Sequence, residues 1–280
     1  MLASEAALNE WLAFAGQLAD AAHDLLAPAA ALRPKVQVKA DRSFVTALDA
    51  QIELRMRELI AQRYPSHGVL GEEYGAGGAG NAGGVSGTVG DVVWVLDPID
   101  GTAPFIAGVP VFGTLIALAV QGQPLIGVMH LPMTQQRWQG VAGRATTLNG
   151  SPVRTRSCAA LGQAILTSSN PDFFSAAERP ALDALRGQTA WRIYGGCCMS
   201  YGLLAAGRTD VAIDSGFKVW DYAPFRPIVE GAGGRITDWA GQPLTLASGA
   251  QVLAAGDTAR HDDARRLIDA ALSAPNPLPV

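Results

Sequence analysis

The stretch Val92-Val93-Trp94-Val95-Leu96-Asp97-Pro98-Ile99-Asp100-Gly101-Thr102 decides how this chain is interpreted. Its first five residues form an apolar run with the length and composition of a buried strand. Pro98 cannot extend a sheet ladder and Gly101 tolerates unusual backbone angles, so the strand should end where two carboxylates stand three residues apart. Such a strand end can supply oxygen ligands to a hard divalent cation. A plain turn is the alternative, because Asp, Pro and Gly are ordinary turn residues.

Composition excludes several classes of protein. A chain of 280 residues can form one large domain or two lobes that share a cleft. The net charge is −4 and no block is dense in Lys or Arg, which argues against a nucleic-acid partner. The three cysteines give no disulfide framework, and no apolar stretch reaches the roughly 18 residues of a membrane helix. We therefore expect a soluble cytoplasmic protein without a nucleic-acid or membrane partner.

The first half of the chain predicts two helices and then a sheet. Residues 4–27 read as a helix, and a second helix begins at Thr46 with an apolar face that recurs at helical spacing. The Gly/Ala stretch at about 75–87 resembles a mobile loop, and its match to a dinucleotide-binding fingerprint is weak because no helix follows it. Strand-like runs follow at 111–120, 125–131 and 138–141, with a turn at Asn149-Gly150.

The second half of the chain alternates between strands and helices. The expected strands are 164–167, 191–194, 210–213 and 251–254, and the expected helices lie near 178–186, 198–207, 221–231 and 258–272. The chain is therefore predicted to be an α/β protein with an α+β first lobe at 1–155, built on an antiparallel sheet, and an α/β second lobe at 156–280.

Acidic residues recur where these elements begin or end. Glu72 follows Gly71 in a short polar break, Asp221 opens an apolar helix, and Asp49 lies in the first turn of the helix begun by Thr46. Each acid has an ordinary explanation: a capping box, a helix N-terminus, or a solvated pair with Glu73. These explanations account for each acid alone, but not for their recurrence beside apolar segments.

Taken together, the motifs resemble the inositol monophosphatase family of metal-dependent phosphatases over about residues 36–240. The resemblance rests on Gly71-Glu72-Glu73, on Asp97-Pro98-Ile99-Asp100-Gly101-Thr102, on Trp220-Asp221-Tyr222-Ala223-Pro224, and on a first motif from Lys39 to Asp49. It implies the layered α-β-α-β-α architecture of sugar phosphatases, a small-molecule phosphate ester as substrate, and a homodimer.

The same resemblance implies a metal site and a way to activate water. The metal ligands would be the carboxylates and one carbonyl of Glu72, Asp97, Asp100, Asp221 and Ile99, which would hold two or three Mg²⁺ ions. Clustered carboxylates repel one another unless hard cations neutralise them, which agrees with this assignment.

Catalysis and phosphate binding are assigned on the same basis. Thr102 paired with Asp49 would position the attacking water, with Glu72 assisting, while the N–H groups of Gly101 and Thr102 would bind phosphate oxygens. The expected activity is a Mg²⁺-dependent phosphomonoesterase without a covalent intermediate.

Substrate identity is expected to depend on Gly196, Cys197, Asp214 and Lys218, which fall where the family binds the alcohol. Several segments resemble the histidinol-phosphatase branch, although Ala103 stands where that branch commonly has Lys, and Cys197 where it has an acid. Histidinol phosphate is the leading candidate. The alternatives are inositol 1-phosphate, a nucleotide 3′-phosphate, or a non-catalytic regulatory protein on the same scaffold.

Overall fold

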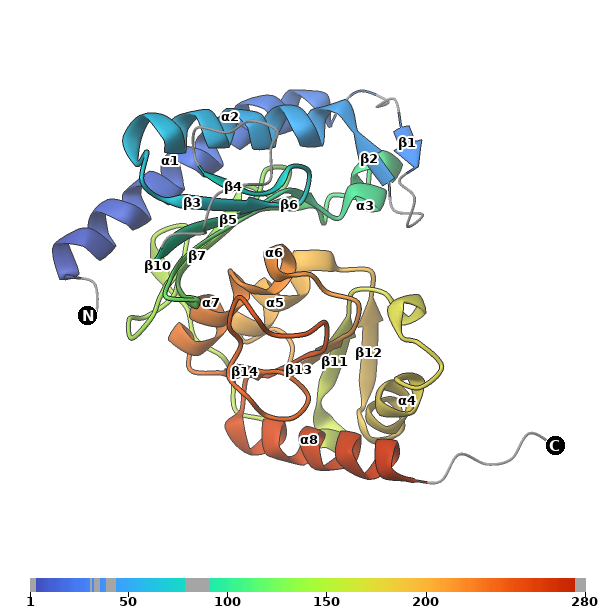
Figure 1. Ribbon diagram of the computed structural model, residues 1–280. Coiled ribbons are helices and arrows are strands. Elements are labelled where there is room, and N and C mark those ends of the chain that lie inside the picture. The colour runs from blue at the N-terminus through green and yellow to red at the C-terminus, as the bar shows by residue number, and fades with distance from the viewer. Residues whose placement is uncertain (1–3, 31, 33–35, 39–43, 79–90, 275–280) are drawn as a thin grey trace.

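The described residues stack in five layers (Figure 1). The structure is a computed structural model that describes residues 4–30, 32, 36–38, 44–78 and 91–274. Helices α1 (Glu5–Ala29) and α2 (Ala47–Arg63) cover the outer face of a first sheet, and α4 (Arg179–Gln188) and α8 (Thr258–Ser273) lie outside a second. Between the sheets lie α5 (Cys197–Ala205), α6 (Val219–Tyr222) and α7 (Phe225–Gly231). The predicted α-β-α-β-α architecture is confirmed.

Within the described ranges, the first sheet has eight strands and is antiparallel except for one pair. In spatial order they are β10 (Ser151–Pro152), β9 (Thr147–Leu148), β8 (Gln136–Val141), β7 (Gln123–Leu131), β6 (Gly113–Val120), β5 (Val92–Asp100), β3 (Gly68–Gly71) and β4 (Gly75–Gly78). Only β3 and β5 run parallel in this sheet as described. The short helix α3 (Thr102–Ala107) follows β5, and a separate ribbon pairs β1 (Val36–Val38) with β2 (Phe44–Thr46).

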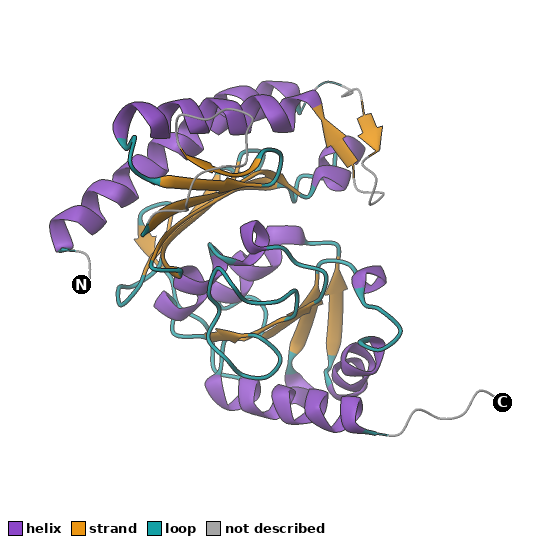
Figure 2. Cartoon of the chain, in the orientation of Figure 1, coloured by secondary structure: helices purple, strands orange, loops and turns teal. Residues whose placement is uncertain are grey.

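The second sheet is mixed, with five strands in the described part of the chain. Their order is β12 (Trp191–Tyr194), β11 (Ile165–Ser168), β13 (Val211–Asp214), β15 (Val252–Ala255) and β14 (Arg235–Thr237). The first three run parallel, whereas β15 pairs antiparallel with both of its neighbours. The 3-10 turns η1 (Leu161–Gln163) and η2 (Pro171–Phe173) complete this half, seen in Figure 2. The lobe boundary at 155/156 stays a prediction.

Three local predictions were wrong. The strand expected to stop at Pro98 continues to Asp100, because a bulge between Asp97 and Asp100 accommodates a residue without an N–H. Gly75–Gly78 is a strand rather than a loop, because its backbone pairs antiparallel with β3 and glycines need no side chain to do so; residues 79–87 of the proposed loop lie outside the described residues. The helix expected at 221–231 is two helices, since Pro224 has no N–H to continue the hydrogen-bond ladder.

Close packing of α7 brings the second half of the chain against the first sheet. A Cβ added at Gly127 on β7 would lie 2.1 Å from the carbonyl oxygen of Pro224, and one at Gly140 on β8 would lie 2.5 Å from the backbone of Pro227. Only glycine permits this approach. The consequence is that α6, immediately before α7 in the chain, packs against β5 and β6.

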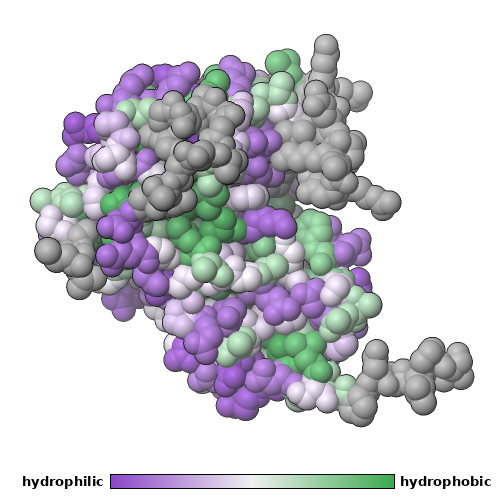
Figure 3. All heavy atoms as spheres, viewed as in Figure 1, coloured by the Kyte–Doolittle hydropathy of each residue, from purple (hydrophilic) through white to green (hydrophobic). Residues whose placement is uncertain are grey.

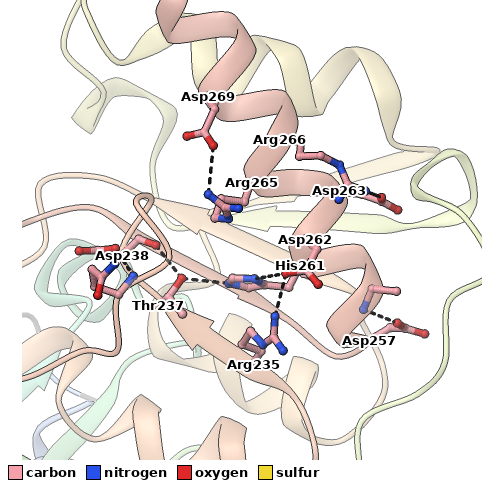
Figure 4. A network of polar contacts seen from close by, with 12 residues as sticks. Arg235, Thr237, Asp238, Asp257, His261, Asp262, Asp263, Arg265, Arg266 and Asp269 are labelled. Carbon is pink, nitrogen blue, oxygen red and sulfur yellow. Dashed lines mark hydrogen bonds and ion pairs between the residues drawn. The ribbon is translucent and has the colours of Figure 1, made fainter.

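The outermost helix, α8, is held to β14 by polar contacts (Figure 4). His261 is buried and its Nε2 lies 3.0 Å from Thr237 Oγ1, while Arg235 pairs with Asp262 at 2.7 Å. Burial lowers the pKa of His261 to about 4, so the ring is neutral near pH 7. In the view of Figure 3, hydrophilic side chains gather along the lower edge of the molecule, beside a hydrophobic patch. None of the helices searched in the described residues has the length and apolar character needed to cross a membrane.

A candidate metal centre between the two sheets

A β-bulge at the end of β5 turns two acids toward the same side. Asp97 pairs with Leu115 and Asp100 pairs with Gly113, so β5 has one more residue than β6 over this interval. In a regular strand, residues three apart point to opposite faces; an inserted residue re-aims one of them. Pro98 suits the bulge because it has no N–H, and its carbonyl accepts a hydrogen bond of 2.8 Å from Thr114 Oγ1.

Asp221 joins these acids from the other half of the chain. One carboxylate oxygen from each of Asp97, Asp100 and Asp221 lies within 4.8 Å of the others, in a search of the described residues. Asp100 Oδ2 accepts the Cys198 N–H at 2.7 Å, and Asp221 Oδ2 accepts the Lys218 N–H at 2.6 Å. Backbone donors therefore orient two of the three acids.

Asp97 has an unsatisfied oxygen in this space. Its side chain is 1% exposed, and its Oδ1 has no hydrogen-bond partner among the described residues. Burial raises the pKa of Asp97 well above its ordinary value, and the carboxylates of Glu72, Asp100 and Asp221 raise it further. Burial also raises the pKa of Asp100, and of Asp221 together with the charge on Asp100. A hard cation would coordinate the unpartnered Asp97 oxygen and neutralise the repulsion between the carboxylates, so the residues fit Mg²⁺.

Glu72 lies in the tight turn of the β3–β4 hairpin. Gly71 pairs with Gly75 across the three-residue turn, and Gly75 has a φ of +66° that glycine adopts without strain. The Glu72 N–H donates to the carbonyl of Leu96, the residue before Asp97, at 3.2 Å. The hairpin turn is therefore tied to the end of β5, where the charge of Glu72 acts on Asp97 and Asp221.

The hydroxyl of Thr102 lies between Asp49 and the bulge. Thr102 Oγ1 is 3.5 Å from Asp49 Oδ1 and 3.1 Å from the carbonyl oxygen of Ile99, both within donating reach. The other oxygen of Asp49 accepts the N–H and the hydroxyl of Thr46 at 2.9 and 2.6 Å, so Asp49 closes a capping box at the start of α2. The cap uses Oδ2 of Asp49 and leaves Oδ1 of the same carboxylate within reach of Thr102.

Cys197 packs directly against Gly101, the N-cap residue that precedes α3. A Cβ added at Gly101, where φ is +82°, would lie only 3.0 Å from Cys197 Sγ. Cys197 itself has a φ of +45°, which is uncommon for a residue with a side chain. Burial and the nearby charges of Asp100 and Asp214 raise the pKa of this thiol, so it is protonated near neutral pH. Cys198 is buried, and neither cysteine forms a disulfide.

The remaining substrate residues are placed differently from one another. Gly196 immediately precedes α5, and Lys218 is exposed beside Asp221. Asp214 ends β13 fully buried, and its carboxylate accepts the Ser169 N–H at 2.6 Å, Tyr201 Oη at 2.9 Å and the Ser168 hydroxyl at 3.1 Å. Protein groups thus occupy the Asp214 oxygens in this structure. Lys39, part of the first motif, lies outside the described residues.

Two features of this centre were not found in the sequence. The backbone N–H of Cys198 orients Asp100, and a buried Glu53–Arg57 pair supports the Glu72 turn. Only the second had a detectable signal, since Glu53 and Arg57 follow Asp49 at intervals of four residues on one helix.

Known proteins resemble this chain in sequence and in fold. The model of the inositol monophosphatase family matches residues 7–272. The chloroplastic bifunctional phosphatase IMPL2 of Arabidopsis thaliana is 40% identical over 93% of this chain and 75% of its own length. Histidinol-phosphatase of Mycobacterium tuberculosis is 35% identical over 75% of this chain and 80% of its own. A solved inositol monophosphatase from Zymomonas mobilis superposes with a TM-score of 0.83 at 37% identity, covering 93% of this chain and 98% of that one.

The matched region spans both sheets and every acid of the cluster, and the family it defines is metal-dependent. The agreement extends from the motifs around Asp97 to the five-layered fold. This chain therefore belongs to the inositol monophosphatase family and is a phosphoric monoester hydrolase.

Proposed function

We propose that this protein is a Mg²⁺-dependent phosphomonoesterase that hydrolyses a small phosphorylated alcohol by attack of water, with histidinol phosphate as its leading substrate. The observation that carries the proposal is the convergence of Asp97, Asp100 and Asp221 within 4.8 Å, beside a Thr102 hydroxyl that can donate to Asp49. Inositol 1-phosphate and nucleotide 3′-phosphates are the competing substrates.

Five residues would hold two or three Mg²⁺ ions: Glu72, Asp97, Asp100 and Asp221 through their carboxylates, and Ile99 through its carbonyl. When bound, Mg²⁺ supplies a water of lowered pKa and positive charge against the phosphoryl and leaving oxygens. The orphaned Asp97 Oδ1 supports this assignment, because a buried oxygen without a donor is costly unless a cation completes it.

Thr102 and Asp49 would orient the attacking water. If the Thr102 hydroxyl donates to Asp49, the Thr102 oxygen can accept a hydrogen bond from the attacking water. That hydrogen bond would turn a lone pair of the water toward phosphorus. Thr46 supports this arrangement by fixing the far oxygen of Asp49, which leaves Oδ1 to face Thr102. Glu72 would assist by accepting a proton from the water.

The phosphate and the alcohol would bind on the Cys197 side of the cluster. The N–H groups of Gly101 and Thr102 would donate to phosphate oxygens, and Cys197, in contact with Gly101, would face the leaving alcohol. Gly196 and exposed Lys218 flank that region. Asp214 would contribute through a hydroxyl or amine contact only if the substrate displaces one of its present donors.

Histidinol phosphate is favoured for two reasons. A relative named histidinol-phosphatase is 35% identical to this chain. Several segments of this sequence also resemble the histidinol-phosphatase branch of the family. The Cys197 and Ala103 departures weaken the match to that branch at two positions.

The test is phosphate release from histidinol phosphate, inositol 1-phosphate and a nucleoside 3′,5′-bisphosphate, each measured with Mg²⁺ and with EDTA. We expect Mg²⁺-dependent turnover with the highest kcat/KM on histidinol phosphate. A higher kcat/KM on another ester would reassign the substrate, and no release from any ester would favour the regulatory alternative.

The homodimer and the cytoplasmic location stay predictions. The edge strand β12 exposes Trp191 at 68% and Ile193 at 42%, and large apolar side chains on a sheet edge favour association. Sedimentation of the wild type and of Trp191→Lys tests the dimer, which the substitution should weaken if β12 lies in the interface.

A further inference from the structure

Helix α2 presents a buried stripe of charge toward the hairpin that carries Glu72. Asp49, Glu53 and Arg57 recur every four residues and are 1%, 0% and 3% exposed. Charged side chains are rarely this buried, because desolvation opposes their attraction. Apolar replacements of such pairs are often neutral or stabilising, so stability alone does not explain the stripe.

The Glu53 carboxylate fills the inside of the β3–β4 turn. It accepts the N–H of Glu73 at 2.7 Å and the N–H of Tyr74 at 3.3 Å, the two residues that follow Glu72. A Cβ added at Gly71, the residue before Glu72, would lie 2.1 Å from Glu53 Oε1. The carboxylate therefore contacts the chain on both sides of Glu72.

Arg57 locks Glu53 and the far end of the turn. Its Nε donates to Glu53 Oε1 at 2.8 Å, and another guanidinium nitrogen donates to the Gly75 carbonyl at 2.6 Å. The guanidinium carbon also lies 5.9 Å from the centre of the Tyr74 ring. The planar fork of arginine can reach both acceptors from one fixed position, which a lysine cannot do.

The same helix also reaches the residue proposed to orient water. Asp49, one turn before Glu53, lies 3.5 Å from the Thr102 hydroxyl. One rigid element thus contacts both Thr102 and the Glu72 turn.

We infer that Glu53, held by Arg57, is a positioning residue that fixes Glu72 relative to Thr102 for metal binding. The inference rests on the proposed function, because it takes Glu72 as a metal ligand. Groups that orient metal ligands typically contribute 10- to 100-fold in affinity or activity.

The test compares Glu53→Gln with a matched control, Asp210→Asn. Asp210 is another buried carboxylate, 2% exposed, which pairs with Arg156 at 2.7 and 2.6 Å and accepts the Ile165 N–H at 2.8 Å. Both substitutions remove a charge that binds an arginine and the backbone. Mg²⁺ binding is measured by calorimetry on the metal-free proteins, together with hydrogen exchange of the segment 71–75.

We expect the Mg²⁺ Kd of Glu53→Gln to rise about 10- to 100-fold, with faster exchange at Glu73 and Tyr74. Asp210→Asn should lower the unfolding temperature while its Mg²⁺ Kd stays within about twofold of wild type. An unchanged Kd in folded Glu53→Gln overturns the inference, as does an equal loss in both variants.

A second variant decides the matter if Glu53→Gln does not fold. Arg57→Lys keeps the charge but cannot hold Glu53 and Gly75 together, so its Mg²⁺ Kd should rise severalfold, and an unchanged value overturns the inference. Failure of the proposed function looks different, because the wild type itself would then neither bind Mg²⁺ nor release phosphate.

Discussion

Asp97 and Asp214 are both buried acids at strand ends, and their surroundings differ in kind. Asp97, in β5, has an oxygen without a hydrogen-bond partner in the described structure, and other carboxylates surround it. Asp214, the last residue of β13, accepts hydrogen bonds from the serines 168 and 169 and from Tyr201. Burial raises the pKa of both.

The two acids differ in whether protein donors satisfy the carboxylate. Asp214 has such donors, whereas the cluster around Asp97 needs a ligand to complete it. Hydrogen-bond donors stabilise the Asp214 carboxylate and hold its pKa to about 7 against the effect of burial. The cluster around Asp97 lacks enough donors and adds repulsion, so a cation must supply what the protein omits. Burial alone would not have distinguished the two.

The largest expected effect comes from removing the charge of Asp97, the acid with few hydrogen-bond donors. Asp97→Asn keeps the shape of the side chain and removes a charge from the cluster. We expect kcat/KM to fall about 10²- to 10³-fold, the scale of losing one major electrostatic contact. Near-normal Mg²⁺-dependent turnover by a folded Asp97→Asn protein would contradict the claim that the Asp97 cluster is a cation site.

The second prediction concerns pH and Asp214. The pKa of Asp214 is about 7 in the folded protein, above its value in the unfolded chain. Asp214 therefore contributes fully to the free energy of unfolding below about pH 4, and this contribution is lost as the pH rises toward 7. Asp214→Asn should be less stable than wild type at pH 4, because an amide NH₂ replaces Oδ2, the oxygen that accepts the hydroxyls of Tyr201 and Ser169. The deficit should shrink by on the order of 3 kcal/mol by pH 7.

Urea unfolding of both proteins at several pH values measures this slope. A deficit that is constant with pH would mean that Asp214 does not titrate in this range.

The third prediction concerns an acid introduced at Cys197, next to Gly101 and the metal cluster. Cys197→Asp should raise the ratio of kcat/KM for histidinol phosphate over inositol 1-phosphate by about ten- to a hundredfold, or roughly 1.5–3 kcal/mol, through one charge-assisted contact. Aspartate also tolerates the positive φ at this position. Cys197→Asn is the isosteric neutral control, and an equal ratio in both variants would exclude Cys197 as a specificity residue.

The smallest effect is on the metal-free protein. In EDTA at pH 8, where more of the cluster is ionised, Asp97→Asn should stabilise the fold by about 1 kcal/mol by relieving repulsion. Denaturant titration measures this change, and destabilisation instead would indicate that the cluster is not repulsive.

Local pattern was sufficient for most of the fold. The apolar run at Val92–Leu96 predicted β5, and the strand at Trp191–Tyr194 has the predicted bounds. The misses have physical causes: Gly75–Gly78 carries no side-chain signal because its pairing uses the backbone alone, and a single proline divides an apolar helix without changing its periodicity.

The candidate site was predictable only where its residues lie in short motifs. Asp97, Asp100 and Asp221 were identified that way, and the structure brings them together. The donors to Asp214 come from β11 and α5, so no local pattern could show that its oxygens are occupied. Glu53 was missed because a charged residue on a helix ordinarily faces solvent.

Thermal unfolding of the wild type against Mg²⁺ concentration tests most directly whether the Asp97 cluster is a cation site. Binding to the folded state alone should raise the unfolding temperature steadily, with about 2.7 kcal/mol gained at a hundred times the Kd. The account predicts this rise in wild type and in Asp214→Asn, and its loss in Asp97→Asn. An unfolding temperature that is the same in EDTA and in millimolar Mg²⁺ would contradict it.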